Sequence, residues 1–264
     1  MNGGKTVRVE TAGAIGRVIF CRPEVHNAFN AQVIDEMTFA FKRLKTDQDV
    51  RVVILTGEGK SFCAGADLNW MSDVRSAAYE DNLDEARRLA DLFYDIYSFP
   101  KPVIGRINGA AIGGGTGFVA VTDIAVAAQS AVFSFSEVKI GVVPACISPY
   151  VIKRVGEGRA REFFLTGERL TAERALTAGL VNRSVPDDLL DATVNGLVES
   201  LLSSGPEAIK VCKQLLQTVP QQSVDDYKEY TARVIADLRQ SPEGQEGMDA
   251  FLNKRKPNWV IEGD

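Results

Sequence analysis

Two short glycine-rich segments constrain this chain of 264 residues more than any other feature. The first is residues 61–68, Ser-Phe-Cys-Ala-Gly-Ala-Asp-Leu, and the second is residues 108–117, Asn-Gly-Ala-Ala-Ile-Gly-Gly-Gly-Thr-Gly. Each follows a mainly apolar run, residues 52–55 and 103–107, that predicts a buried strand. Glycine lets a ligand approach the backbone closely, so that backbone N–H groups become usable donors. Two such groups aimed at one oxygen form an oxyanion hole. We therefore expect both segments to follow strands and to present donors to a common ligand.

The composition is that of an ordinary globular protein without metal or disulfide staples. It is 45% apolar and 25% charged, with a net charge of −5 and a pI of about 5.2. That charge argues against a nucleic-acid partner, which usually requires a basic face. The cysteines are widely spaced and His26 is the only histidine, so no zinc site is expected. Scattered thiols fit a reducing compartment.

The chain start carries no secretory segment, and no apolar run is long enough to span a bilayer. We therefore expect a cytoplasmic protein with no membrane partner.

Strand and helix patterns alternate through residues 1–188, which indicates an α/β domain. Strands are expected at residues 7–10, 17–20, 52–55, 103–107, 123–128 and 132–135, and helices at 31–44, 80–97 and 116–122. From residue 189 to 264 the pattern is helical throughout. Helices are expected at residues 189–202, 206–218, 224–238 and 242–253.

Ala64 and Gly114 are the candidate donors. Ala64 stands at the end of a strand, where its N–H can point into a cleft. Gly114 stands at the start of a short helix, where backbone N–H groups lack intrahelical partners and the helix dipole attracts negative charge. The alternative is that these glycines only mark tight turns and close helix–strand packing.

The paired segments, together with four others in the same order, resemble the enoyl-CoA hydratase/isomerase family, the crotonases. The further segments are residues 22–28, 135–144, 165–182 and 250–255. The resemblance implies a spiral of ββα turns, followed by C-terminal helices (189–264) that build a homotrimer or homohexamer. It also implies an acyl-coenzyme A substrate and no separate cofactor.

The resemblance assigns roles to individual residues. The thioester oxygen would lie between the N–H groups of Ala64 and Gly114. The residues expected along the coenzyme A are Arg22, Ala64, Gly65, Ala66, Asp67, Leu68, Gly114, Gly117 and Lys254. Arg22 and Lys254 are candidates for its phosphates, with Lys254 acting from a neighbouring subunit; the alternative for both is a solvated surface charge.

Glu137 matches the family's catalytic glutamate. Its neighbours Phe135, Val138 and Ile140 are apolar, so burial is expected to raise its pKa toward the working pH. The alternative is an exposed, solvated glutamate. Many crotonases use a second glutamate, and the position that corresponds to it is Gly117 in this chain. One carboxylate must therefore move the protons.

Three functions follow from this arrangement. The first is hydration of a 2-enoyl-CoA, with Glu137 taking and returning a proton. The second is isomerisation of a 3-enoyl-CoA, and the third is acyl-CoA binding without catalysis. Residues 136–150 also resemble a subgroup associated with 3-methylglutaconyl-CoA hydratases of leucine degradation. That carboxylated acyl chain would need a cation, for which Lys139 and Arg75 are candidates.

Two smaller features have both a functional and a structural interpretation. Trp70, Met71, Tyr79 and Leu83 could line an acyl pocket, although apolar residues at such spacing are commonly core. The lone His26 has no Gly-x-Ser-x-Gly elbow to accompany it, so we expect it to hydrogen-bond locally rather than to join a catalytic triad.

Overall fold

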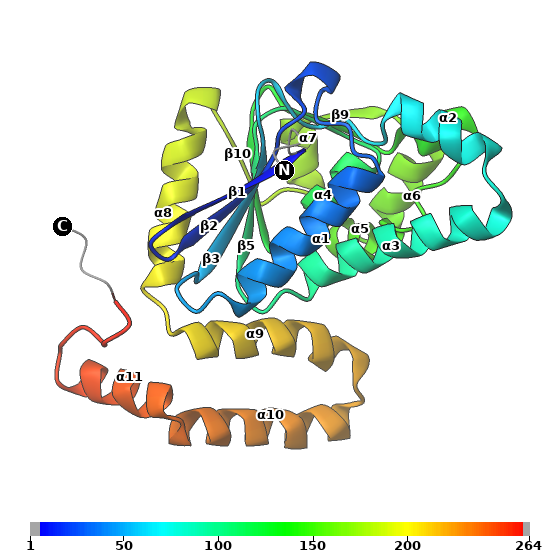
Figure 1. Cartoon of the computed structure of the whole chain (residues 1–264). Coiled ribbons are helices and arrows are strands. Elements are labelled where there is room, and N and C mark those ends of the chain that lie inside the picture. The colour runs from blue at the N-terminus through cyan, green and yellow to red at the C-terminus, as the bar shows by residue number, and fades with distance from the viewer. Residues whose placement is uncertain (1–5, 261–264) are drawn as a thin grey trace.

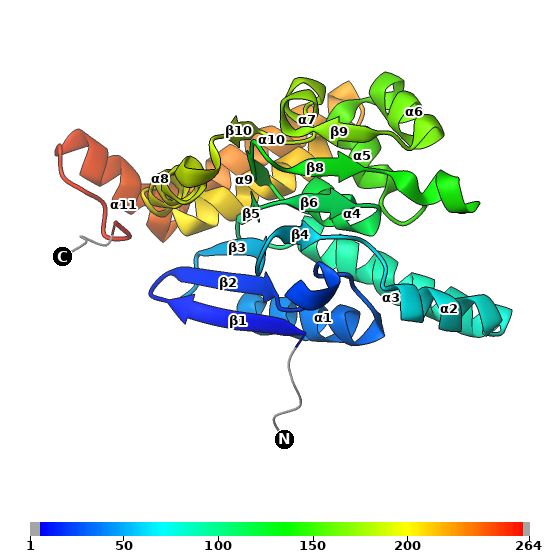
Figure 2. The same ribbon diagram turned by 90° about the horizontal axis from the view of Figure 1, so that it is seen from above.

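The computed structural model describes residues 6–260, and two sheets dominate it. The larger has the strand order β1-β2-β3-β5-β7-β10, and the smaller has the order β4-β6-β8-β9. Only the β1–β2 and β8–β9 pairs are antiparallel. Figure 2 shows the strands of the two sheets following one another across the molecule.

The strands are short. They are β1 Val7–Ala12, β2 Ile15–Phe20, β3 Val52–Gly57, β4 Ser61–Cys63, β5 Val103–Ile107, β6 Ala110–Ile112, β7 Ile124–Ala128, β8 Val132–Ser134, β9 Arg169–Thr171 and β10 Arg183–Val185. The α-helices are α1 Ala31–Thr46, α2 Leu68–Ser76, α3 Tyr79–Tyr97, α4 Gly114–Val121, α5 Ser148–Val155, α6 Glu157–Thr166, α7 Ala172–Ala178, α8 Leu190–Leu202, α9 Pro206–Thr218, α10 Val224–Gln240 and α11 Pro242–Leu252. A 3-10 helix, η2 Ser136–Ile140, carries Glu137.

The chain winds as a spiral in which each turn gives one strand to each sheet and then one or two helices. The turns are β3-β4-α2-α3, β5-β6-α4 and β7-β8-η2-α5-α6. Parallel neighbours such as β3 and β5 require a crossover between them, and the second strand and the helices supply it. The expected spiral of ββα turns is confirmed.

Helices cover both faces of the larger sheet. The buried face of α1, with Val33, Met37 and Phe41, packs into the main core, and Asn30 caps its first turn. On the other face, Val194 and Val198 of α8 pack with β3, β5 and β7 in a second cluster. The division expected after residue 188 stays a prediction, but α8 itself packs on the sheet.

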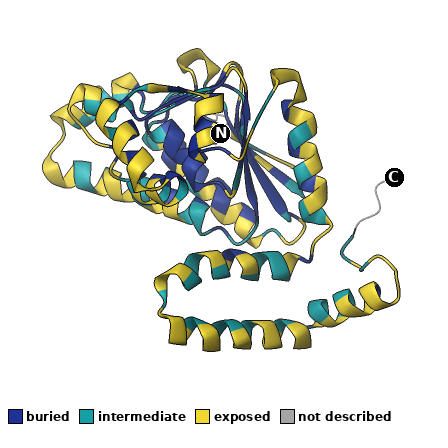
Figure 3. Cartoon of the chain, turned by 180° about the vertical axis from the view of Figure 1, so that it is seen from behind, coloured by how far each residue is buried: buried dark blue, intermediate teal, exposed yellow. Residues whose placement is uncertain are grey.

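Helices α9 to α11 form an arm below the two sheets (Figure 1). Within the described residues, α10 buries none of its side chains, and α9 buries only Lys213. Figure 3 shows this arm as mostly exposed. Lys213 Nζ donates to Asp123 Oδ2 at 2.5 Å and to the Lys101 carbonyl at 3.1 Å, which ties α9 to the body.

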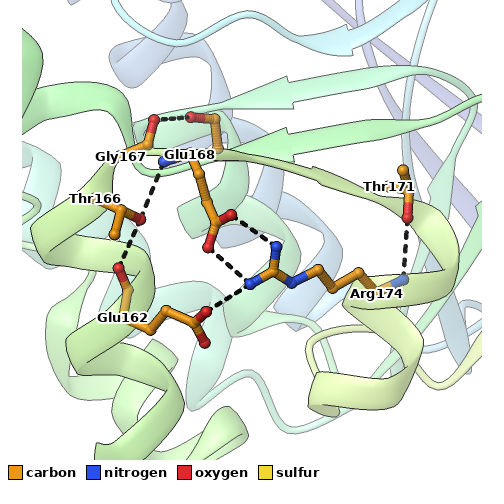
Figure 4. A network of polar contacts seen from close by, with 7 residues as sticks. Glu162, Thr166, Gly167, Glu168, Thr171 and Arg174 are labelled. Carbon is orange, nitrogen blue, oxygen red and sulfur yellow. Dashed lines mark hydrogen bonds and ion pairs between the residues drawn. The ribbon is translucent and has the colours of Figure 1, made fainter.

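A polar network braces the strand that leads into η2. Arg174 donates to Glu162 Oε1 at 2.7 Å and to both carboxylate oxygens of Glu168 at 2.7 and 2.8 Å (Figure 4). Beside it, Ser134 Oγ donates to the Gly167 carbonyl at 3.3 Å. These contacts join α6, the residues just before β9, and α7 next to β8, whose last residue, Ser134, lies two residues before the start of η2.

The long elements agree with the sequence-based prediction, whereas several short ones were not predicted. The strands β6, β9 and β10 have three residues each, too few for a period-2 pattern. The strand expected to end at Ala64 is β4, which ends one residue earlier, at Cys63. The helices α2, α5, α6 and α7 were not predicted either, and α4 begins at Gly114 rather than at residue 116. No described helix is long and apolar enough to cross a bilayer.

Candidate active site

A cavity of about 380 Å³ lies where the first residues after β4, β6 and β8 meet. Its walls come from both glycine-rich segments, from α2 and α3, and from residues 136–147. The lining residues are Phe29, Ala64, Gly65, Ala66, Leu68, Trp70, Met71, Leu89, Phe93, Ile112, Gly113, Gly114, Ser136, Glu137, Ile140, Val142, Val143, Pro144, Ala145, Cys146 and Ile147. This volume suits a small organic group.

Three successive turns of the spiral each bring one polar group to this cavity. The turn through β4 brings the backbone around Ala66, the turn through β6 brings Gly114, and the turn through β8 brings Glu137. The strands are parallel neighbours in the order β4-β6-β8, so their carboxyl ends lie at the same edge. This placement brings the two glycine-rich segments and Glu137 together at one cavity, as expected.

The three consecutive glycines of the second segment, residues 113–115, are each required for a different steric reason. Gly113 has φ +54°, and a Cβ there would lie 3.1 Å from Glu137 Oε1. A Cβ on Gly114 would lie 2.7 Å from the Phe29 ring. A Cβ on Gly115 would lie 2.0 Å from the Cys63 carbonyl oxygen. Side chains at these positions would therefore push α4 away from β4 and from the cavity.

The donor predicted at Ala64 is wrong. The Ala64 N–H donates to the His26 carbonyl at 3.0 Å, so it is already satisfied inside the protein. Two residues later, Ala66 lies between Gly65, whose carbonyl accepts from Phe29 N–H, and Asp67, whose N–H donates to the Phe29 carbonyl. Among the described residues, no acceptor takes the N–H of Ala66 or of Gly114. Both residues line the cavity, and their N–H groups are free to bind a ligand there.

Glu137 has the environment that its neighbours predict. Its Oε2 is buried, and within residues 6–260 it has no hydrogen-bond partner. Burial raises the pKa of Glu137 above its usual range, against a smaller opposite effect of its own backbone N–H. It is the only charged residue in the cavity lining, so no neighbouring cation there holds it ionised. A carboxylate with a raised pKa is suited to accept and return a proton.

Gly117 does not reach the cavity, which corrects its expected binding role. It is buried in α4, and a Cβ there would lie 2.1 Å from Cγ2 of Ile147 and 3.1 Å from the Phe93 ring. Ile147 lines the cavity instead, at the place toward which a side chain at position 117 would point. An apolar group thus fills the space where a second carboxylate would need room.

Arg22 and Asp67 were expected along the coenzyme A, but they bind one another. Arg22 Nη2 donates to Asp67 Oδ2 at 2.7 Å, with only 17% and 7% of the two side chains exposed. Arg22 Nη1 also donates to the Ala28 carbonyl, and Asp67 Oδ1 accepts from Asn69 N–H at the start of α2. The pair therefore anchors the loop and α2, and neither side chain lines the cavity.

The remaining expected residues divide into two groups. Gly65, Ala66 and Leu68 line the cavity as predicted. Trp70 and Met71 also line it, which decides between the pocket and core alternatives considered for them. Tyr79, Leu83, Lys139 and Arg75 do not belong to the lining; Leu89 and Phe93 of α3 take the place expected for Tyr79 and Leu83. Lys254 follows α11, which lies at the opposite end of the molecule from α2 (Figure 1), so this chain alone does not bring it to the cavity.

His26 hydrogen-bonds to a distant segment rather than within its own turn, which corrects the local bond expected for it. Its Nδ1 lies 3.1 Å from Ser61 Oγ, and its backbone is left-handed with φ +54°. Sequence reasoning missed Phe29 and Ile147, both of which line the cavity. The signal available for Phe29 was its place immediately after residues 22–28, a segment already singled out.

Comparisons with known proteins agree with this geometry. A family model described as enoyl-CoA hydratase/isomerase matches residues 10–261. The chain belongs to this family. It is 32% identical to a short-chain-enoyl-CoA hydratase of Clostridium acetobutylicum, covering 95% of each chain.

Solved structures of this family share the fold. An enoyl-CoA hydratase from Shewanella pealeana is 37% identical, with a TM-score of 0.93 over 96% of each chain. A Legionella pneumophila protein assigned as an enoyl-CoA hydratase/isomerase (crotonase) is 42% identical, with a TM-score of 0.92 over 97% of this chain and 100% of that one. The protein is therefore an enzyme with a crotonase-type spiral, and the family implies an acyl-CoA substrate.

Proposed function

We propose that the protein is an enoyl-CoA hydratase that adds water to a 2-enoyl-CoA thioester. The observation that carries the proposal is the partnerless Oε2 of Glu137, in a cavity that also receives two backbone N–H groups without acceptors. A buried carboxylate of raised pKa suits proton transfer, and paired N–H groups suit a developing oxyanion.

The chemistry assigns one role to each group. The N–H groups of Ala66 and Gly114 hold the thioester carbonyl oxygen. Glu137 accepts a proton from water while the water oxygen bonds to C3, and the electrons of the C2–C3 double bond move to the carbonyl oxygen as an enolate. When the enolate collapses, C2 takes a proton from Glu137, which restores the carboxylate.

A second reaction, isomerisation of a 3-enoyl-CoA to a 2-enoyl-CoA, is favoured by one observation. Ile147 fills the space beside Gly117, so the described cavity lining offers a single carboxylate. One carboxylate is enough to carry a proton from C2 to C4, and this step needs no bound water.

The acyl group is the finer part of the proposal. The apolar lining suits a short 2-enoyl chain, and the relative from Clostridium acetobutylicum is named for short-chain substrates. For 3-methylglutaconyl-CoA a cation must meet the second carboxylate. Arg75 lies four residues after the cavity residue Met71, hence on the same face of α2, and is the candidate on this chain.

Product analysis tests these alternatives. The purified protein is incubated in ¹⁸O-labelled water with crotonyl-CoA, 3-methylglutaconyl-CoA or a 3-enoyl-CoA. A labelled 3-hydroxyacyl-CoA is the expected product. A shifted double bond from the 3-enoyl-CoA, without label, would replace the hydratase by an isomerase, and tight acyl-CoA binding with no product would leave only a binding subunit.

We also propose that the helical arm assembles copies of this chain, as a homotrimer or homohexamer. The arm exposes large apolar side chains, among them Leu216 (75%), Phe251 (83%) and Leu252 (78%). An exposed apolar surface of this kind marks a protein–protein contact. In such an assembly Lys254, two residues beyond α11, is a candidate for the coenzyme A phosphates of a neighbouring copy.

A further inference from the structure

Phe29 precedes both glycine-rich segments in the sequence but contacts both of them in space, and its backbone holds the first one in place. Its N–H donates to the Gly65 carbonyl and its carbonyl accepts from Asp67 N–H, both at 2.8 Å. These bonds form an isolated parallel bridge between Phe29 and Ala66. In a parallel bridge the residue between the two bonded ones turns its own N–H and carbonyl away from the partner strand. The backbone of Phe29 therefore directs the Ala66 N–H to the opposite side.

The ring of Phe29 fixes the second segment. Its Cε1 and Cζ atoms are so close to Gly114 that a Cβ there would lie 2.7 Å from both. The ring is held in turn by Trp70 at 5.6 Å and by Phe118 at 5.8 Å between ring centroids. Phe29 is only 2% exposed, so the ring has little room to move. The ring therefore limits how closely the first turn of α4, which begins at Gly114, can approach Phe29.

We propose that Phe29 is a positioning residue that sets the relative placement of the Ala66 and Gly114 N–H groups. An oxyanion hole works only when both donors lie within hydrogen-bond distance of the same oxygen. A misplacement of about 1 Å can cost roughly 100-fold in rate. Phe29 contacts both segments at once, the first through its backbone and the second through its ring, so this residue links the two donors. The inference rests on the proposed function only in taking these two N–H groups as the donors.

Acetoacetyl-CoA provides a measurement that needs no turnover. Its enolate absorbs in the near ultraviolet, and a protein that holds the thioester oxygen in an oxyanion hole raises the enolate fraction of the bound ligand. We compare Phe29→Leu with Phe41→Leu. Phe41 is a matched control because it is also 2% exposed and also makes an edge-to-face ring contact, with Phe99 at 5.2 Å, but it lies in α1 and outside the cavity lining.

The expected result separates the two variants. Phe29→Leu lowers kcat for crotonyl-CoA about 10-fold, with KM within about 2-fold, and lowers the bound enolate fraction. Phe41→Leu loses similar thermal stability but keeps kcat and the enolate fraction. Equal kcat and enolate fraction in the two folded variants would overturn the proposal. Enolisation of acetoacetyl-CoA without hydration of crotonyl-CoA would overturn the proposed reaction alone.

A double substitution tests the ring contact and keeps the proposal testable if Phe29→Leu folds poorly. Gly114→Ala places a methyl group 2.7 Å from the ring and is expected to lower the enolate fraction by itself. In the Phe29→Leu background the smaller, flexible side chain leaves room, so adding Gly114→Ala is expected to cost less than it does in the wild type. An enolate fraction unchanged by Gly114→Ala, or additive losses in the double variant, would show that the ring does not position Gly114.

Discussion

In the hydration proposed above, Glu137 faces opposing demands, because proton abstraction from water needs its charged form whereas its buried position favours the neutral form. The raised pKa of this side chain is the result. We expect Glu137→Gln to lower kcat by roughly 10²–10⁴ with the fold intact, because the amide cannot accept the proton. Steady-state kinetics and circular dichroism check this. For the wild type, kcat/KM should rise with pH through the raised pKa; unchanged turnover in the variant would remove Glu137 from the mechanism.

The same shift has a consequence for stability. A carboxyl whose pKa is higher in the folded than in the unfolded state makes the native state lose stability as pH rises from its ordinary pKa, about 4.3, through the raised value. The glutamine variant carries no charge and escapes this loss. We therefore expect the melting temperature of Glu137→Gln, relative to wild type, to increase between pH 4 and pH 8. A difference that stays constant across this range would contradict the raised pKa.

Gly117 tests whether a missing carboxylate limits the reaction. We expect Gly117→Glu to destabilise the protein by about 1–3 kcal/mol and not to accelerate hydration, because its Cβ would overlap Ile147. Denaturant unfolding and crotonyl-CoA kinetics measure both effects. Gly158→Glu in α6 is the control, since a Cβ there meets nothing within 4 Å. Faster hydration in Gly117→Glu would show that Ile147 yields and that the second carboxylate is useful.

Part of the site can be predicted residue by residue, and part cannot. Gly114 follows from a local signal, a glycine at a helix start. Glu137 was assigned through its match to the family's glutamate segment, because its local sequence also fits an exposed, solvated glutamate. On the first segment the donor was predicted at Ala64, whose N–H the structure satisfies internally, whereas the N–H of Ala66, two residues later, has no acceptor among the described residues. The hydrogen bonds that settle this point come from His26 and Phe29, more than 30 positions away along the chain. No pattern within residues 61–68 contains that information.

At the scale of elements, the ion pair between Arg22 and Asp67 anchors α2 beside the cavity. We expect Arg22→Ala to lower the free energy of unfolding by about 3 kcal/mol, because Asp67 would be left as an unpaired, largely buried charge. The control is Arg8→Ala, whose ion-pair partner Glu10 is about half exposed and should cost less than about 1 kcal/mol. Urea unfolding compares the two variants. A raised KM for crotonyl-CoA with unchanged stability would instead support the phosphate-binding role first expected for Arg22.

How well a helix or strand can be predicted from the sequence depends on its length. Helices α1, α3 and α9 contain three or more turns, so their apolar period is visible in the sequence. The short helix α2 buries none of its residues and is held by its cap at Asp67 and by the hydrogen bond from Trp70 Nε1 to Glu85. Such an element depends on contacts with other segments, which a local pattern does not reveal.

At the scale of the whole molecule, the helical arm α9 to α11 buries few side chains, so contacts within this chain do little to hold it beneath the two sheets. Its exposed apolar side chains are the basis for the proposed assembly. We expect Phe251→Asp, in α11, to shift the protein toward monomer by placing a charge in the contact, as measured by light scattering on a size-exclusion column. The control is Leu165→Asp, a 75% exposed residue of α6 outside the arm. An oligomeric state unchanged in Phe251→Asp would remove α11 from the contact.

Because three successive turns of the spiral line the site, a bound acyl-CoA would contact all three turns and hold them together. Ala66, Gly114 and Glu137 come from successive turns whose strands lie side by side in one sheet. A ligand that touches all three, as proposed, adds its binding free energy to the stability of the folded state. Hydrogen exchange at β4, β6 and β8 should then slow together, and to a similar degree, when ligand is added. Local unfolding of any one of these turns would thus abolish catalysis and weaken the packing of the other two at the same time.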